Sequence, residues 1–193
     1  MRAFIAIELP ESVQHALQQL QRRLAELGAD VTWVERPQRH VTMRFLGEIT
    51  EAQRDQVEAL MAQLGRQQPP VRLHLLGLGA FPTLSSPRIV WAGVREGAMD
   101  LARLAGELNA GLAGLQIRPD EHPFAAHVTL GRVRSARRLR ELSAALGSYE
   151  AGEGIWWEAD HWTLFRSVLT SQGPLYEALA RVAFSGATPA SSA

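Results

Sequence analysis

Apolar and polar positions alternate or recur at helical spacing along the first half of the chain, and they predict an ordered series of strands and helices. One helix is predicted between Pro10 and Gly28, where leucine and valine recur every three or four residues. A second is predicted to begin after Thr50, which forms a capping-box pattern with Gln53, and to end at Gly65. Alternating apolar positions predict strands at residues 2–9, 31–34, 39–46 and 71–78.

The second half of the chain repeats this order. Leucines at helical spacing predict a helix over residues 98–113, and Ser135 is expected to cap another helix that ends at Gly147. The first strands begin at residues 2 and 88 and the second helices at residues 50 and 135, so the offsets are 86 and 85. Such similar offsets favour a duplicated unit. Extended segments are predicted at residues 88–94, 116–118, 126–133 and 155–169.

The duplication predicts an α+β, bilobal fold in a single domain over residues 1–185. We expect pseudo-repeat halves at about residues 1–82 and 87–170, joined by the turn-rich segment 81–87. Each half is expected to supply one mainly antiparallel sheet with helices on its outer face, so that the active site lies in a cleft between two sheets. Residues 186–193 are expected to form a flexible C-terminal tail.

The candidate chemistry lies in two copies of one short pattern. Residues 40–43 and 127–130 both read His-Val-Thr-apolar, and the two histidines lie 87 positions apart. In a strand, residues two apart face the same way, so each histidine shares a face with its threonine. Two imidazoles can provide an acid and a base, and two hydroxyls can donate hydrogen bonds to phosphate oxygens. The pair therefore indicates acid–base chemistry on a phosphodiester.

Strand alternation also places the residues that follow each motif. Arg44 lies four positions after His40 and is expected on the same face, whereas Phe45 is expected in the helix-covered core. Arg132 lies five positions after His127 and is therefore expected on the opposite face, unless Gly131 allows a β-bulge or the strand bends there.

Composition narrows the class of protein further. The net charge is zero, which argues against a nonspecific coat on nucleic acid, and all twenty cationic residues are arginine. Without lysine no Schiff base or P-loop lysine is possible, and without cysteine there is no disulfide, thiolate metal site or cysteine nucleophile. The absence of a signal-peptide pattern and of a membrane-length apolar run predicts a cytoplasmic protein that does not enter a membrane.

Two of the other histidines are assigned structural or exposed positions, and most tryptophans are assigned structural roles. His15 lies in a predicted helix and His74 in a predicted strand, while His122 and His161 are secondary candidates for substrate contact. A zinc site needs three or four ligands, and neither motif offers a third at useful spacing, so we expect no metal. Four tryptophans are assigned to the core or to lobe packing rather than to base stacking: Trp91, Trp156, Trp157 and Trp162.

With these flanks the chain resembles the RNA 2′,3′-cyclic phosphodiesterases of the two-histidine phosphoesterase superfamily, once called 2′-5′ RNA ligases. The resemblance extends over about residues 2–182 and rests on segments 2–10, 40–48, 87–94 and 123–133. It implies an RNA end or a small nucleotide with a 2′,3′-cyclic phosphate as substrate, which is opened at the 3′ oxygen to leave a 2′-phosphomonoester. We expect a monomer that needs no cofactor.

The resemblance also implies residue roles. His40 is the proton donor to the departing 3′ oxygen, and His127 is the acceptor that activates water. Many relatives carry a histidine two residues before the second catalytic one, and Ala125 occupies that place here, which puts an auxiliary role for that position in doubt. Four further side chains are implied to hold the phosphate or to be candidate contacts to it: Thr42, Thr129, Arg132 and Arg44.

Two alternatives stay open. A 2′-5′ RNA ligase would run the reverse reaction through the same transition state, and a 2′-5′ phosphodiesterase would use the same groups. A non-catalytic RNA- or nucleotide-binding module would keep the lobes, although intact histidine and threonine in both motifs argue against it.

Overall fold

A computed structural model describes residues 1–120, 122–149, 154–171 and 173–187. Within these residues the strands are β1 (Arg2–Glu8), β2 (Val31–Trp33), β3 (His40–Glu48), β4 (Val71–Thr83), β5 (Ser86–Val94), β6 (His127–Val133), β7 (Ile155–Ala159), β8 (His161–Thr170) and β9 (Gly173–Ala183). The helices are α1 (Glu11–Ala25), the short 3₁₀ helix η1 (Arg36–Gln38), α2 (Glu51–Gln67), α3 (Ala98–Ala113) and α4 (Leu139–Gly147). None of these helices is long and apolar enough to cross a membrane.

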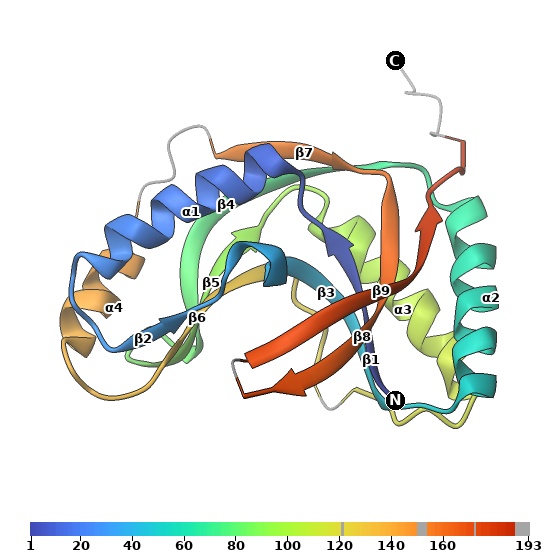
Figure 1. The fold of residues 1–193 in the computed structure, drawn as a ribbon. Coiled ribbons are helices and arrows are strands. Elements are labelled where there is room, and N and C mark those ends of the chain that lie inside the picture. The colour runs from blue at the N-terminus through green and yellow to red at the C-terminus, as the bar shows by residue number, and fades with distance from the viewer. Residues whose placement is uncertain (121, 150–153, 172, 188–193) are drawn as a thin grey trace, which may run out of the picture.

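All neighbouring strands are antiparallel, which confirms the α+β class. They follow the order β7-β4-β5-β6-β3-β1-β8-β9, and the short strand β2 pairs with β6. A single register pair, Val41 with Val128, joins β3 to β6, whereas β5 and β6 share a ladder of five pairs. The two expected sheets are therefore halves of one strand path that meet at one point, and helices flank each half (Figure 1).

Each lobe draws strands and helices from both halves of the sequence. In the first lobe β1 and β3 pair onward with β8 and β9, and α2 and α3 contact this lobe. In the second lobe β6 and β5 pair onward with β4 and β7, which α4 and α1 contact. The expectation that each sequence half supplies one sheet is therefore wrong. Its physical reason is the hairpin between β4 and β5, a local pairing that carries β4 from the first half into the second lobe.

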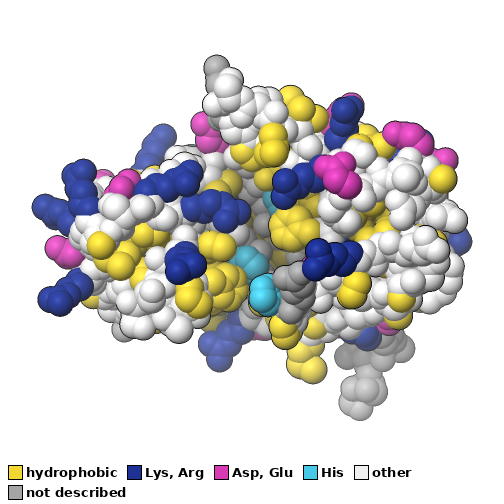
Figure 2. All heavy atoms as spheres, turned by 90° about the horizontal axis from the view of Figure 1, so that it is seen from below, with side chains coloured by type: hydrophobic (Ala, Val, Ile, Leu, Met, Phe, Trp, Pro, Cys, Tyr) yellow, Lys and Arg dark blue, Asp and Glu magenta, His cyan; other side chains and the backbone are white. Residues whose placement is uncertain are grey.

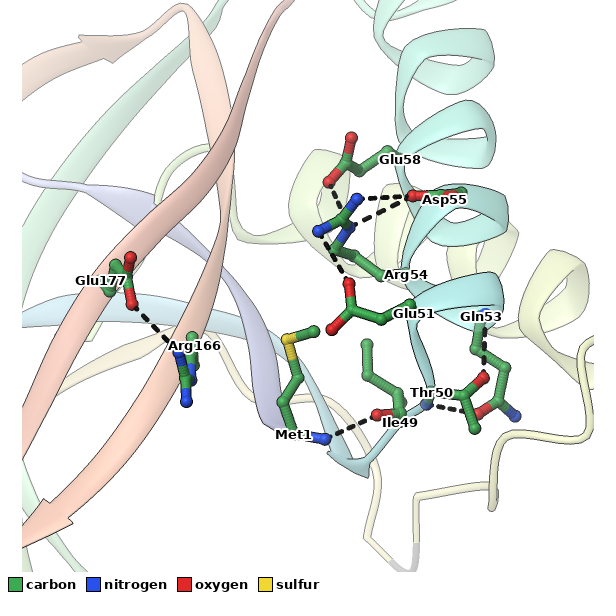
Figure 3. A network of polar contacts seen from close by, with 10 residues as sticks. All are labelled: Met1, Ile49, Thr50, Glu51, Gln53, Arg54, Asp55, Glu58, Arg166 and Glu177. Atoms are coloured by element: carbon green, nitrogen blue, oxygen red, sulfur yellow. Dashed lines mark hydrogen bonds and ion pairs between the residues drawn. The ribbon is translucent and has the colours of Figure 1, made fainter.

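Polar contacts at the start of α2 fix the end of β3 (Figure 3). The Thr50 hydroxyl accepts a hydrogen bond from the Gln53 amide at 3.1 Å, and the Gln53 side chain accepts one from the Thr50 amide at 3.0 Å. This confirms the predicted capping box. The Met1 ammonium donates to the Ile49 carbonyl at 2.7 Å, so the start of β1 is held against the end of β3.

Three segments differ from the expected pattern. Residues 116–118 form no strand, and Gln116 has a positive φ of 56°. Helix α4 begins at Leu139 rather than after Ser135, because Arg138 adopts a left-handed conformation at its N-terminus. Strand β9 is an additional element. In the segment expected to be a flexible tail, Gly186 donates a backbone hydrogen bond to Gln68 at 2.9 Å, and residues 188–193 lie outside the described residues.

Candidate active site

The two motif strands cross at the single pair Val41–Val128, and this crossing brings the motifs together. Both valine side chains are fully buried, so the residues on either side of them face the opposite, open side of the sheet. Antiparallel register puts His40 opposite Thr129 and Thr42 opposite His127. The histidines are diagonal neighbours, a spacing of about 7–8 Å in such pairs. One phosphate group can therefore lie within reach of all four side chains.

A pocket of about 750 Å³ opens over this crossing. Its lining includes His40, Thr42, Thr129 and Arg132, four of the six residues that the sequence singled out. Figure 2 shows histidine side chains in the hollow between the two lobes, with arginines on both sides of it. His127 lies beside the pocket, and its ring packs edge-on against Phe81, with 5.0 Å between the ring centroids.

The orientation of His127 is set by the backbone. Its Nδ1 lies 2.7 Å from the Ala125 carbonyl, a distance at which Nδ1–H donates. In the neutral ring Nε2 is then unprotonated and able to accept a proton. Burial lowers the pKa of His127, and the hydrogen bond to Ala125 opposes this effect. At neutral pH the ring is therefore in the form that a general base requires.

His40 is held in a matching way but in a more enclosed place. Its ring stacks on Phe4 with 4.9 Å between centroids and meets Tyr176 edge-on at 5.6 Å. Burial lowers the pKa of His40 to about 4, a backbone hydrogen bond to Gln38 raises it, and the charge of His127 lowers it further. Both histidines thus bond to the carbonyl two residues earlier. The protonated form of His40 is therefore a stronger acid than an ordinary imidazolium, and a neighbouring anion is needed to populate it at neutral pH.

Arg44 does not face the pocket, and the expectation for its orientation is wrong. The β1–β3 register shifts between the pairs Ile5–Arg44 and Ala6–Thr42, so β3 carries an extra residue at Met43. This bulge turns Arg44 into the interior, where it is 2% exposed, contacts Asp120 at 2.5 Å and donates to the Arg118 carbonyl. It also turns Phe45 outward, contrary to expectation: Phe45 is 59% exposed and lines the pocket.

A second bulge in the equivalent place explains Arg132. The β5–β6 register shifts between the pairs Val90–Gly131 and Trp91–Thr129, so Leu130 is the extra residue. Leu130 and Gly131 are both buried, and Arg132 is exposed on the side of the pocket. The β-bulge that the sequence left open is therefore present, at Leu130 beside Gly131, and it turns Arg132 to the face of the pocket.

A buried polar network beneath the motifs was missed by sequence reasoning. Arg39 is 2% exposed, and its guanidinium donates to carbonyl and amide oxygens of Gln14, Gln18 and Gln21 on α1. The Gln21 amide donates in turn to the Leu130 carbonyl at 2.6 Å, at the bulge of β6. The network thus joins the residue before His40 to the strand of His127. Its sequence signal is the presence of glutamines on the apolar face of α1.

The remaining aromatic and histidine residues divide between core and cleft. Trp157 and Trp162 are buried in the core as expected, whereas Trp156, contrary to expectation, is 39% exposed on the surface. Trp91 differs from expectation: it pairs with Thr129 in register and lies 6.3 Å from His127 between ring centroids, so it belongs to the cleft. Two other aromatic residues that the sequence did not single out, Trp33 and Tyr176, line the pocket.

Three of the other histidines have neighbours of their own. His15 is exposed and lies 2.8 Å from the Gln19 side chain on α1. The ring of His74 stacks on Trp156, with 4.0 Å between centroids. His161 contacts Glu8 at 3.0 Å and Asp160 at 2.6 Å, in a cluster in which Thr163 and Arg181 also donate to Glu8.

Two crossed strands, each with histidine and threonine on the open face of a cleft, define a two-histidine phosphoesterase. Comparison with known families agrees: the model of the LigT-like phosphoesterases matches the chain over residues 7–91 and again over residues 93–176. The chain belongs to this family.

Known relatives extend over almost the whole chain. The RNA 2′,3′-cyclic phosphodiesterase of Aeropyrum pernix is 36% identical over 169 residues, which are 86% of this chain and 93% of that protein. The crystal structure of TT0787 of Thermus thermophilus superposes with a TM-score of 0.81 at 31% identity, covering 96% of this chain and 99% of the other. That of E. coli LigT complexed with 3′-AMP superposes with a TM-score of 0.78 at 25% identity, covering 95% and 97%.

Proposed function

We propose that this protein hydrolyses the 2′,3′-cyclic phosphate of RNA ends or nucleotides to a 2′-phosphomonoester without a metal ion. The observation that carries the proposal is the crossing of β3 and β6, which opposes each histidine to the threonine of the other motif. Relatives that cover most of the chain carry the name RNA 2′,3′-cyclic phosphodiesterase, which supports the same reaction.

His127 serves as the base. Because its Nδ1–H donates to the Ala125 carbonyl, Nε2 is free to take a proton from water. The water oxygen forms a bond to phosphorus while the bond between phosphorus and the 3′ oxygen breaks. The proton lost by the water is then held on His127.

His40 serves as the acid. Its pKa of about 4 in the free protein means that the protonated ring gives up its proton readily. The negative charge of the cyclic phosphate, bound beside the ring, favours the protonated form. His40 donates this proton to the departing 3′ oxygen, so the cycle ends with His40 neutral and His127 protonated. Exchange with solvent restores both.

The threonines and Arg132 stabilise the phosphate. The hydroxyls of Thr42 and Thr129 each lie opposite a histidine and can donate to the non-bridging oxygens. Arg132 lines the same pocket and adds positive charge where negative charge develops. Arg44 has no part in this proposal, because it is buried against Asp120.

The test uses an oligoribonucleotide with a 2′,3′-cyclic phosphate in the presence of EDTA. The wild-type protein should produce a 2′-phosphate, and His40→Ala and His127→Ala should each lower kcat by about 10²–10⁴-fold. Full activity in either variant, or activity that disappears with EDTA, contradicts the mechanism. The same product analysis, run with a 5′-hydroxyl acceptor strand, separates hydrolysis from 2′-5′ ligation. Bound RNA that is never turned over would indicate a binding module instead.

A further inference from the structure

The pocket extends well beyond the reacting centre. Its volume of about 750 Å³ lies in the upper part of the range of about 300–1,000 Å³ that small-molecule sites occupy. Beyond the motif residues it is walled by β2 with η1 on one side and by the tip of the β8–β9 hairpin on the other. The Gln38 side chain donates to the Pro174 carbonyl at 2.7 Å and joins these two walls.

This extension is positively charged although the whole chain has no net charge. The charged residues of the lining, apart from the histidines, are Arg2, Arg132, Arg134 and Glu35. In the described residues no ion pair involves Arg2, Arg132 or Arg134. Burial raises the pKa of Tyr176, and the positive charges of Arg132 and Arg2 lower it. Both guanidinium groups therefore lie near the Tyr176 side chain.

A hydrogen bond to β2 holds Arg134 at the pocket. Its Nε donates to the Thr32 hydroxyl at 2.8 Å, which leaves the terminal nitrogens of the guanidinium for a ligand. Arg134 and Arg132 share a face of the chain beyond the β6 bulge, since they are two residues apart. Together with Arg2 at the start of β1, they give the pocket cationic side chains on both lobes.

The pocket lies on the side of the leaving group. His40 belongs to its lining and His127 does not. In the proposed reaction His40 serves the 3′ oxygen, so the ribose lies on the His40 side of the phosphate. The RNA strand is attached to that ribose through its 5′ oxygen, and it must therefore enter the pocket.

We propose that Arg2 and Arg134 form a subsite for the backbone phosphates of the nucleotides that precede the cyclic end, so that the protein prefers an oligoribonucleotide to a mononucleotide. This inference rests on the proposed function. Guanidinium groups bind phosphate bidentately, and unpaired ones give up no existing ion pair when they do so. Phe45 and Trp33, which also line the pocket, provide aromatic surface for bases without selecting a sequence.

The test compares two substrates that differ only in length. Hydrolysis is measured for a nucleoside 2′,3′-cyclic phosphate and for a trinucleotide with the same cyclic end. In the double variant Arg2→Gln/Arg134→Gln, kcat/KM for the trinucleotide should fall by about 100-fold or more, because two charge-assisted contacts of about 1.5–3 kcal/mol each are lost together. The value for the mononucleotide should stay within about twofold. The salt dependence for the trinucleotide should also become less steep, by about 1.4 in a double-logarithmic plot.

Matched controls separate this subsite from general charge and from the chemistry. Arg23→Gln/Arg66→Gln removes two exposed arginines from the outer helices α1 and α2, and it should leave kcat/KM unchanged for both substrates. Arg2→Lys/Arg134→Lys should restore part of the trinucleotide rate. An unchanged trinucleotide rate, or equal losses on both substrates, overturns the subsite. If the wild-type protein turns over neither substrate, the proposed function itself is wrong.

Discussion

The two motif strands are alike up to their bulges and differ after them. In β3 and β6 the histidine and threonine occupy the same positions, each histidine bonds to the carbonyl two residues earlier, and a bulge follows the motif. Beyond that point β3 buries Arg44 and exposes Phe45, whereas β6 buries Gly131 and exposes Arg132. The shared part performs the chemistry, and the divergent part gives the cleft one aromatic wall and one cationic wall.

The neighbours of each bulge explain the choice of residue. A Cβ at Gly131 would lie 2.5 Å from Val31 and 2.9 Å from Trp33, because β2 packs there. Among the described residues no strand occupies the matching place beside β3, and the segment with Arg118 and Asp120 is bound there by the Arg44 side chain. Beyond its bulge, β6 is therefore held by backbone pairing with β2, whereas β3 is held by the contacts of the buried Arg44 side chain.

The largest expected effect is a different response of the two histidine variants to a change of leaving group. With a cyclic substrate whose 3′ oxygen is replaced by sulfur, the leaving thiolate needs no proton. His40→Ala, which should lose about 10²–10⁴-fold on the oxygen substrate, should then recover most of its rate, whereas His127→Ala should not. The measurement is kcat/KM for both substrates. Recovery of His127→Ala instead would reverse the assigned roles.

The second effect concerns stability and pH. The pKa of His40 is lowered to about 4 from 6.5, so the unfolded state binds the proton more tightly. The contribution of His40 to stability is present above pH 6.5 and is lost as the pH falls towards 4, by up to about 3 kcal/mol. Urea unfolding of wild type and His40→Gln at pH 7 and pH 4 should show this difference. The exposed His15→Gln is the control and should show none.

The arginines that follow the motifs should separate activity from stability. Arg132→Gln should lower kcat/KM by about 10–100-fold with an unchanged melting temperature, because it removes a contact of about 1.5–3 kcal/mol to an ionised group. Arg44→Gln should lower the melting temperature and leave kcat/KM within a few-fold, because Arg44 holds Asp120 rather than substrate. The opposite pattern would show that the bulges are placed wrongly.

The smallest effect tests why glycine stands in the second bulge. Gly131→Ala should lower the free energy of unfolding by about 1–3 kcal/mol, since its Cβ overlaps Val31 and Trp33. Adding Val31→Ala should restore part of the loss. Gly106→Ala on α3 is the matched control, because nothing lies within 4 Å of its Cβ, and it should be neutral or slightly stabilising. Equal losses at Gly131 and Gly106 would contradict the packing argument.

Local patterns in the sequence predicted the elements that local interactions determine. The helix over residues 98–113 and the capping box of Thr50 with Gln53 were confirmed, because spacing and capping are properties of short segments. Strand β9 carries Leu, Glu, Ala and Arg, residues typical of helices, and pairing with β8 overrides that preference. The exchange of strands between the lobes depends on which strands pair, as β4 does with β5. The alternation of apolar and polar residues along one strand does not identify its pairing partner.

The candidate site was predictable up to the point where the strands lose their regular period. Strand parity put Thr42 and Thr129 on the faces of their histidines, and the crossing of β3 and β6 agrees with this. For Arg44 and Phe45 the same rule failed, because an extra residue at Met43 shifts both side chains to the other face. The buried contacts of Arg39 with α1 are long-range, and only the structure reveals them.

The β8–β9 hairpin has a consequence for the synthesis of the protein. Every other strand and helix precedes it in the chain, yet it completes the sheet beside β1 and brings Tyr176 to the ring of His40. A chain on the ribosome therefore displays both histidines before it has a finished cleft. We expect ribosome-stalled chains that end before β8 not to hydrolyse cyclic-phosphate RNA. Activity should appear only once the β8–β9 hairpin has formed.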